Sequence, residues 1–248
     1  MPTGGRFADR RVVVTGAARG IGAEIARRFS GAGAHVAILD QLVDEAELLA
    51  TALGGIAIGC DLLDAGSTTD AMDAAIAALG GIDVLVNNAG VFRITPLLDI
   101  STDEWDWVFA VNVRAILVTT QIGARTMIAQ GTGGKIVNMA SMGGKVGAAG
   151  QAHYAASKAA VISLTQVAAA ELGAHAINVN AICPGYVLTE MGAATRTPDQ
   201  VEEWSSKSPL GRLAEPSDVA AMALFLASHD ADYCTGQAMN VTGGMITH

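Results

Sequence analysis

Short apolar runs rich in β-branched residues alternate along the chain with longer, alanine-rich segments whose apolar positions repeat at helical spacing. Strands that are apolar along their whole length are typical of a parallel sheet with both faces covered. Ser101 to Glu104 form a capping box, which predicts the start of a long fourth helix. The runs predict strands at 12–15, 35–39, 56–60, 82–86, 135–139, 177–182 and 237–241, and the periodic segments predict helices at 21–32, 42–53, 65–79, 101–129, 153–172 and 217–228.

This alternation predicts one α/β domain over residues 1–248, with a doubly wound parallel sheet of about seven strands and helices on both faces. No linker rich in proline or serine interrupts the alternation. The one long irregular segment, 184–214, lies between the sixth expected strand and the helix after Pro216. Loops of that length inside a compact domain are usually functional, so we expect this segment to form much of a substrate pocket.

Composition and charge mainly exclude classes of protein. The 248 residues carry a net charge of −9, and 51% are hydrophobic against 16% charged. These values exclude intrinsic disorder and argue against nucleic-acid binding. Cys60, Cys183 and Cys234 are an odd number and lack CxxC spacing, which gives neither a disulfide framework nor a zinc site, so we expect no metal. Without a signal-like segment or 18 consecutive uncharged apolar residues, we expect a cytoplasmic protein that binds no membrane.

A glycine-rich run joins the first expected strand to the first expected helix. It reads Thr15-Gly16-Ala17-Ala18-Arg19-Gly20-Ile21-Gly22. Because Gly16, Gly20 and Gly22 have no side chains, the backbone can approach a pyrophosphate closely, and the helix N-terminus adds unpaired N–H groups and a positive dipole end. Strand, turn and helix in this order indicate a Rossmann dinucleotide site, although a glycine-rich turn without a ligand could have the same sequence.

Asp40, which ends the second expected strand, bears on which dinucleotide would bind. Its carboxylate could accept hydrogen bonds from an adenosine ribose and would repel a 2′-phosphate. It could also be the N-cap of the helical segment that begins at Gln41. Arg19 could instead pair with a 2′-phosphate, but its side chain can swing into solvent. The balance favours NAD over NADP.

Other residues follow the expected strands at the edge where doubly wound sheets bind ligands. Asp61 could receive the adenine amine, or could simply belong to a turn. The small and amide residues of Asn87-Asn88-Ala89-Gly90 could line the crevice. Pro184-Gly185 could pack on a nicotinamide ring. Each of these segments could equally be a plain turn.

The strongest candidates for chemistry are Ser141, Tyr154 and Lys158. Ser141 lies just past the fifth expected strand, and Tyr154 and Lys158 share one helix face because they are four residues apart. A free tyrosine has a pKa of about 10, and a nearby ammonium group lowers it. Tyr154 could then take a proton from an alcohol while hydride leaves the same carbon, with Ser141 holding the substrate oxygen. A tyrosine and a lysine on an exposed helix face could have the same spacing.

Four further polar residues lie near these candidates or in the expected long helix. Gln151 and His153 precede Tyr154 and could be helix-start residues or could face a substrate. Tyr186, in the 184–214 segment, could face the same ligand. Asn112 could be an ordinary polar residue of the long helix that faces solvent.

Together these residues resemble the short-chain dehydrogenase/reductase family over nearly the whole chain. The motifs are TGxxxGxG at 15–22, NNAG at 87–90, Asn112, Ser141, YxxSK at 154–158 and Pro184-Gly185. The resemblance implies that Tyr154 is the general acid/base and that Lys158 binds the nicotinamide ribose and lowers the Tyr154 pKa. It also implies that Ser141 orients the substrate and that Asn112 supports a proton-relay water.

The same resemblance implies a cofactor site on many backbone and side-chain groups. Asp40 matches the NAD-preferring pattern of the family, Arg19 matches a feature of its NADP users, and Thr189 matches the contact to the nicotinamide amide. The implied cofactor residues are Gly16, Arg19, Gly20, Ile21, Gly22, Asp40, Asp61, Leu62, Asn88, Ala89, Gly90, Tyr154, Lys158, Pro184, Gly185, Val187 and Thr189.

Within the family, three stretches are similar to sorbitol and related polyol dehydrogenases: 134–141, 158–166 and 231–233. The similarity implies NAD-dependent interconversion of a polyol or other small secondary alcohol and its ketone. The family resemblance also implies a homotetramer.

Two other functions remain open. Arg93 would suit an NADPH-dependent 3-oxoacyl-carrier-protein reductase, but an acidic chain opposes docking of an acidic carrier protein, and 173–176 lacks an arginine often present there. A nucleotide-binding regulator could keep the fold without the chemistry. The intact set of Ser141, Tyr154 and Lys158 argues against that second alternative.

Overall fold

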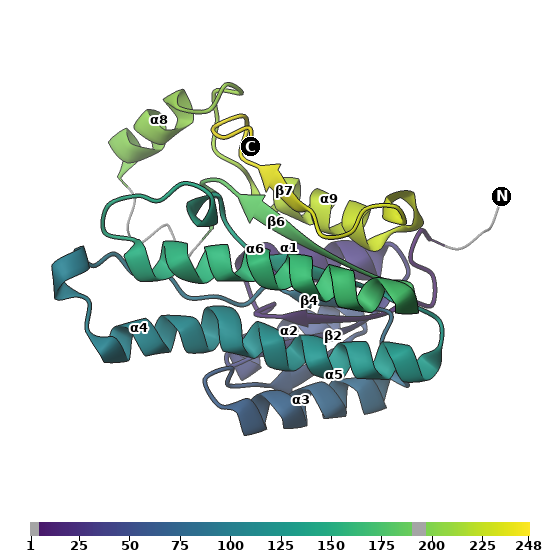
Figure 1. Ribbon diagram of the computed structural model, residues 1–248. Helices are drawn as coiled ribbons and strands as arrows, with labels where there is room; N and C mark the ends of the chain where they lie inside the picture. The colour runs from purple at the N-terminus through teal and green to yellow at the C-terminus, as the bar shows by residue number, and fades with distance from the viewer. Residues whose placement is uncertain (1–4, 190–196) are drawn as a thin grey trace.

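The computed structural model describes residues 5–189 and 197–248 (Figure 1). Its strands form a single parallel sheet in the order β3-β2-β1-β4-β5-β6-β7, so the direction of winding reverses between β1 and β4. This is the doubly wound sheet that the sequence predicts. The strands are β1 (Arg11–Thr15), β2 (His35–Asp40), β3 (Ile56–Gly59), β4 (Val84–Asn87), β5 (Gly134–Met139), β6 (Ile177–Pro184) and β7 (Ala238–Val241).

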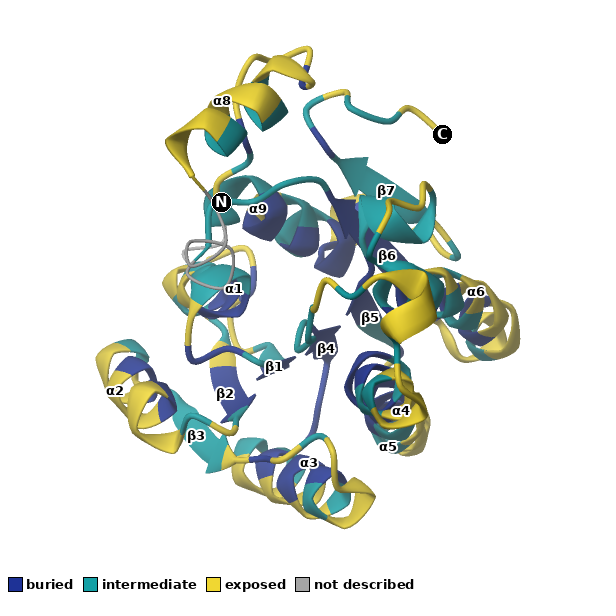
Figure 2. Ribbon diagram, turned by 90° about the vertical axis from the view of Figure 1, so that its left-hand side faces the viewer, coloured by how far each residue is buried: buried dark blue, intermediate teal, exposed yellow. Residues whose placement is uncertain are grey.

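Helices cover both faces of the sheet (Figure 2). One face carries α1 (Gly20–Gly31), α2 (Val43–Leu53) and α9 (Pro216–Ala227), and the other carries α3 (Ala65–Leu79), α5 (Ala115–Gln130) and α6 (Ala152–Leu172). The strands serve both cores because alternate side chains point to opposite faces. In β1, Val12 and Val14 pack with Phe29 of α1, whereas Val13 packs with Met72 of α3.

The long fourth helix is interrupted by a π-helical turn. α4 (Thr102–Phe109) passes through that turn (Ala110–Arg114) into α5, and the extra residue turns Asn112 inward, with 0% of it exposed. The solvent-facing interpretation of Asn112 is therefore wrong. The helical run from Thr102 to Gln130 has the length and hydropathy of a membrane span, but more than half of its apolar window is buried, as in a core helix.

The 184–214 segment is not irregular throughout. It contains α8 (Pro198–Ser206), which lies at the upper left in Figure 1. The side chain of Thr197 accepts a hydrogen bond from the Gln200 N–H, and the Gln200 side chain accepts one from the Thr197 N–H. This capping box, with proline at the first helical position, is the sequence signal that would have predicted α8.

Candidate active site

The glycine-rich loop after β1 packs directly on the turn after β4. Gly16 has a φ of +62°, and a Cβ on it would lie 2.7 Å from the Cα of Ala89. The side-chain amide of Asn88 donates to the backbone oxygen of Gly16 at 2.8 Å. Two motifs that lie far apart in the sequence therefore form one crevice, at the carboxyl edge of the sheet where the winding reverses.

The N-terminus of α1 suits the anionic part of a dinucleotide. Its N-cap residue, Arg19, makes no capping hydrogen bond through its side chain, and its first turn, from Gly20 through Ile21 and Gly22, contains no acidic residue. Free N–H groups and the positive end of the helix dipole are what a pyrophosphate requires. A groove of about 430 Å³ lies beside it, lined by α1, the segment after β6 and the start of α9.

Asp40 lies beside the same loop, but its carboxylate bonds backbone groups. One oxygen accepts a hydrogen bond from the Ala18 N–H at 2.9 Å, and the other accepts one from the Leu42 N–H at 3.0 Å. The N-cap position of α2 is occupied by Leu42, so Asp40 is not the N-cap. Arg19 is exposed and lines the groove beside α1, whereas Asp40 reaches the loop through its hydrogen bond with Ala18, so the choice between NAD and NADP stays a prediction.

Asp61 follows β3 in an exposed turn. Its side chain accepts a hydrogen bond from the Leu63 N–H at 2.9 Å, and its own N–H donates to the Ser67 hydroxyl at 3.0 Å. Leu62 packs partly against the core on the α3 face of the sheet. The turn interpretation of Asp61 is therefore observed, and its contact with adenine stays a prediction.

Ser141, Tyr154 and Lys158 come together at the carboxyl end of β5. Ser141 follows the strand, and its hydroxyl accepts a hydrogen bond from the Gly143 N–H at 3.0 Å and hydrogen-bonds Tyr154. Tyr154 and Lys158 lie in the first turns of α6, with the lysine Nζ 5.7 Å from the centroid of the tyrosine ring. The lysine ammonium donates to the backbone oxygen of Met139 at 2.8 Å. The structure thus brings these three residues together, and their catalytic roles stay predictions.

Burial dominates the electrostatics of this group. It raises the pKa of the Tyr154 phenol, and the hydrogen bond with Ser141 only partly opposes that rise. It lowers the pKa of Lys158 to about 8, because only 3% of that residue is exposed and a charged ammonium is costly there. Desolvation is the largest effect on the phenol, and the expectation that Lys158 lowers the Tyr154 pKa stays a prediction.

Asn112 joins the turn after β4 to the catalytic helix. Its amide oxygen accepts a hydrogen bond from the Val91 N–H at 2.8 Å, and its amide nitrogen donates to the Val91 oxygen and the Ser157 hydroxyl at 3.0 Å. A Cβ on Gly90 would lie 3.2 Å from the Asn112 oxygen and 3.3 Å from the Lys158 Nζ, so these groups converge on the glycine.

The predicted substrate residues have different surroundings. Gln151 is half-buried at the N-cap of α6. His153 is fully buried, and its Nε2 lies 2.9 Å from a carboxylate oxygen of Glu104, so the expectation that it faces a substrate is wrong. Tyr186 stacks on Trp204 of α8, with ring centroids 4.4 Å apart.

The last predicted cofactor residues follow β6. Pro184 ends the strand, and Gly185 is half-buried directly after it. Val187 pairs in a parallel bridge with Ala214, which closes the base of the 184–214 segment. Thr189 is the last residue described before the gap, so the part of the expected substrate loop at 190–196 lies outside the described residues.

Sequence reasoning missed Phe92 at this site. Its ring meets the Tyr154 ring edge-on, with centroids 4.8 Å apart and planes at 82°. The available signal was its position two residues after the NNAG turn, on the edge of the sheet where ligands bind.

The chain is similar to known proteins over nearly its whole length. A model of the family described as "Enoyl-(Acyl carrier protein) reductase" matches residues 16–246. Sorbitol dehydrogenase of Cereibacter sphaeroides is 40% identical, over 96% of this chain and 98% of that enzyme. D-threitol dehydrogenase of Mycolicibacterium smegmatis is 39% identical, over 96% and 94%.

The fold is also that of a solved structure. A short-chain type dehydrogenase/reductase from Mycobacterium marinum superposes with a TM-score of 0.92 and 35% identity, over 98% of this chain and 97% of that one. The chain therefore belongs to the short-chain dehydrogenase/reductase family of NAD(P)-dependent oxidoreductases.

Proposed function

We propose that the protein interconverts a secondary alcohol, either a polyol or another small alcohol, and its ketone, with NAD as redox partner and Tyr154 as general acid/base. The observation that carries this proposal is the meeting of Ser141, Tyr154 and Lys158 at the sheet edge that also holds the uncapped N-terminus of α1. The names of the polyol dehydrogenases to which the chain is similar support the substrate class.

The chain's own residues handle the oxygen and its proton. The hydroxyl of Ser141 positions the substrate oxygen next to the Tyr154 phenol. In oxidation the Tyr154 phenolate takes the hydroxyl proton, and in reduction the neutral phenol donates it. The ammonium of Lys158 donates to a backbone carbonyl, and within residues 5–189 and 197–248 no carboxylate pairs with it, so its charge is available to stabilise the phenolate. NAD, when bound, supplies the hydride acceptor.

The crevice residues would hold the cofactor. The loop from Gly16 to Gly22 suits the pyrophosphate, Asp61 and Leu62 the adenine, and the turn from Asn88 to Gly90 the adjoining ribose. Residues 184–189 would contact the nicotinamide end. The Asp40 carboxylate, fixed beside Ala18, supports NAD because it would repel a 2′-phosphate.

Asn112 would serve the proton relay through its backbone rather than its side chain. Each of its amide hydrogen atoms, and its amide oxygen, already bonds a protein group. A π-helical turn disturbs the regular pairing of backbone carbonyls and is frequent at functional sites. The Asn112 carbonyl is thus the group we propose for binding a relay water.

We further propose a cytoplasmic homotetramer that has no nucleic-acid or membrane partner. The family membership supports the tetramer, and the net charge of −9 supports the absence of nucleic-acid binding. The alternative as a carrier-protein reductase depended on Arg93, but this side chain lies over the Trp107 ring and 3.7 Å from Glu104. It is therefore engaged within the protein.

The test is turnover of a panel of polyols and small secondary alcohols with NAD and with NADP, in the wild type and in Tyr154→Phe. We expect NAD-dependent oxidation in the wild type and a loss of at least about 10³-fold in the variant, because only the phenolic oxygen can move the proton. Circular dichroism and NADH binding should stay as in the wild type. A folded Tyr154→Phe protein that keeps near wild-type rates would rule out the proposed mechanism.

A further inference from the structure

A buried carboxylate next to the catalytic helix joins three segments of the chain. One oxygen of Glu104, on α4, accepts a hydrogen bond from the Thr95 hydroxyl at 2.5 Å and lies 2.9 Å from the Nε2 of His153. Its other oxygen lies 3.7 Å from the Arg93 guanidinium. The side chain of Glu104 is 14% exposed, so solvent competes little for these contacts.

The direction of the hydrogen bond between His153 and Glu104 follows from its acceptor. An ionised carboxylate can only accept a hydrogen bond, so the Nε2–H of His153 donates to Glu104. The Nδ1 of His153 is buried and has no hydrogen-bond partner in the described part of the chain.

Glu104 makes these contacts in place of an ordinary helix cap. The sequence predicts a capping box in which the Glu104 side chain returns to the backbone of Ser101. Only the serine half is observed for α4, where the Ser101 hydroxyl accepts from the Glu104 N–H at 3.1 Å. The carboxylate instead bonds residues 9 and 49 positions away in the sequence.

Two residues that contact the Glu104 carboxylate, His153 and Thr95, each link it to Tyr154. His153 directly precedes Tyr154 in the first turn of α6. Thr95 ends a short segment whose Phe92 ring meets the Tyr154 ring edge-on. The backbone N–H of Thr95 also donates to the Gly150 oxygen at 2.9 Å, so this segment is tied to the chain just before α6.

We propose that Glu104 is a positioning residue: through His153 and Thr95 it holds Tyr154 and Phe92 in their mutual geometry, and so sets the rate of proton transfer and the size of alcohol accepted. Glu104 does not contact the substrate in this proposal. The inference rests on the proposed function, because Tyr154 has to be the acid/base for its placement to matter.

Two variants of Glu104 test the proposal, with an exposed neighbour as control. Glu104→Ala should lower kcat about 10- to 100-fold, because small misplacements of a reacting group cost that much, while NADH affinity stays unchanged. It should also reduce the preference between small and bulky alcohols. Glu104→Gln should restore most of kcat, because an amide oxygen still accepts from Thr95 and His153. Asp103→Ala, one residue away and exposed, should behave as the wild type.

The outcomes separate this inference from the proposed function. An active wild type whose folded Glu104→Ala form keeps kcat and alcohol preference would overturn the positioning role alone. So would a Glu104→Gln protein as impaired as Glu104→Ala. If Glu104→Ala does not fold, Thr95→Val removes only one hydroxyl and should still lower kcat, and an unchanged kcat there would overturn the role. A wild type inactive on every alcohol would overturn the proposed function, and this inference with it.

Discussion

Two lysines at opposite ends of β5 have opposite surroundings. At the amino end, Lys135 donates to a carboxylate oxygen of Asp232 at 2.6 Å and to the side-chain oxygen of Asn178 at 2.8 Å. At the carboxyl end, Lys158 is 3% exposed and donates to the backbone oxygen of Met139. A carboxylate neutralises Lys135, whereas Lys158 is held by the dipole of a backbone carbonyl and keeps its charge.

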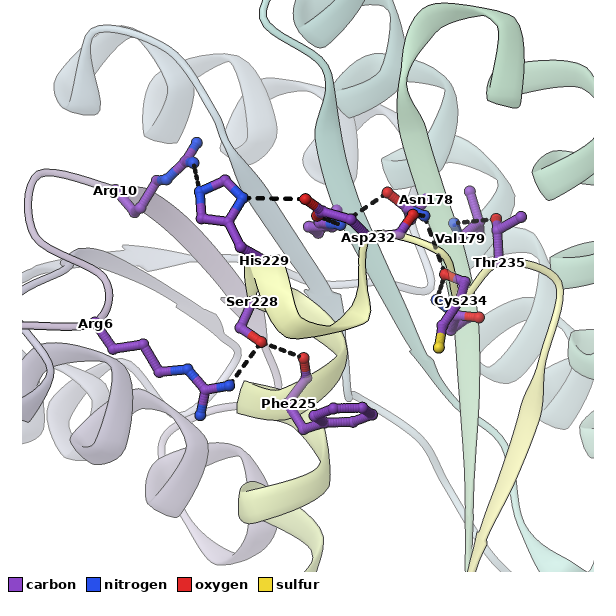
Figure 3. Close-up of polar contacts among 12 residues, drawn as sticks. Arg6, Arg10, Asn178, Val179, Phe225, Ser228, His229, Asp232, Cys234 and Thr235 are labelled. Atoms are coloured by element: carbon purple, nitrogen blue, oxygen red, sulfur yellow. Dashed lines mark hydrogen bonds and ion pairs between the residues drawn. The ribbon is translucent and has the colours of Figure 1, made fainter.

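The rest of the amino edge is paired in the same manner (Figure 3). Arg10 donates to the Nε2 of His229, whose Nδ1 lies 3.3 Å from Asp232. Nearby, Arg11 makes a bidentate contact to Asp83 with both distances at 2.8 Å. Burial by itself would raise the pKa of Asp83, but the hydrogen bonds from Arg11 outweigh it and hold this pKa below its usual value.

The difference separates charges that stabilise the fold from charges that serve chemistry. A buried ion pair neutralises both groups, so neither has charge left to act on a third group. A buried ammonium against a carbonyl is less stable, which is why burial lowers the Lys158 pKa to about 8. That cost is consistent with a site where the charge has to act on Tyr154.

The largest effect should come from removing the unpaired cation. Lys158→Met should lower kcat/KM for alcohol oxidation on the order of 10²-fold or more, because the phenolate loses its neighbouring charge. The alkaline limb of the pH profile should also move upward, since a phenolate without a cation forms at higher pH.

Profiles of kcat/KM against pH, with a deuterated alcohol to show that chemistry is observed, measure both effects. The wild-type limb belongs to the coupled pair, because Lys158 itself begins to lose its proton near pH 8. An isotope-sensitive profile that is flat from about pH 6 to pH 10 would contradict a tyrosine base.

At the amino edge the effect should be on stability. Asp83→Asn should lower the free energy of unfolding by about 3 kcal/mol, because the Asp83 side chain is 8% exposed and Arg11 would lose its charged partner. Urea denaturation measures this, with kcat of the folded protein as control. A loss below about 0.5 kcal/mol, or a change in kcat, would contradict the structural role.

The same variant makes a pH prediction. Because the folded-state pKa of Asp83 is lowered, its contribution to stability is fully present above the unfolded value of about 3.9 and is lost as the pH falls through the folded value. The difference between wild type and Asp83→Asn should therefore shrink below about pH 4. An equal difference at pH 7 and at pH 3 would contradict the ion pair.

A carboxylate at the other edge should affect selectivity. Asp40→Asn should shift the ratio of kcat/KM for NAD over NADP by about tenfold toward NADP, because the charge that opposes a 2′-phosphate is removed. The asparagine oxygen can still accept from the Ala18 N–H, whereas its amide nitrogen cannot accept from the Leu42 N–H. Asp44→Asn, an exposed change in the first turn of α2, is the control. A wild type that prefers NADP would instead implicate Arg19.

The smallest effect should come from the paired lysine. Lys135→Met should lower the free energy of unfolding by about 1 kcal/mol or less, because the Asp232 side chain of this ion pair is 60% exposed. Its kcat/KM and pH profile should match the wild type. A tenfold loss of activity in Lys135→Met would remove the contrast between the two ends of β5.

The sequence alone was sufficient to predict the fold and to select the candidate site residues, whose catalytic roles stay predictions. Strand order along the chain follows from periodicity, and the observed bounds of the expected elements lie within two residues of those predicted. The glycine-rich loop and the Tyr154–Lys158 pair were readable because their members are neighbours in sequence or share a helix face. Helix α8 was not predicted, although its capping box is also formed by residues that are close together in sequence.

Only the tertiary structure decided which groups of the site contact one another. Asn112 is turned inward by a π-helical turn, and Glu104 bonds His153 across 49 residues instead of completing its own cap. Burial raises the Tyr154 pKa, and the hydrogen bond with Ser141 only partly opposes that rise. Local pattern specifies which residue types lie on which element. Desolvation and hydrogen-bond partners depend on distances between segments remote in sequence, and those distances exist only once the helices have packed on the sheet.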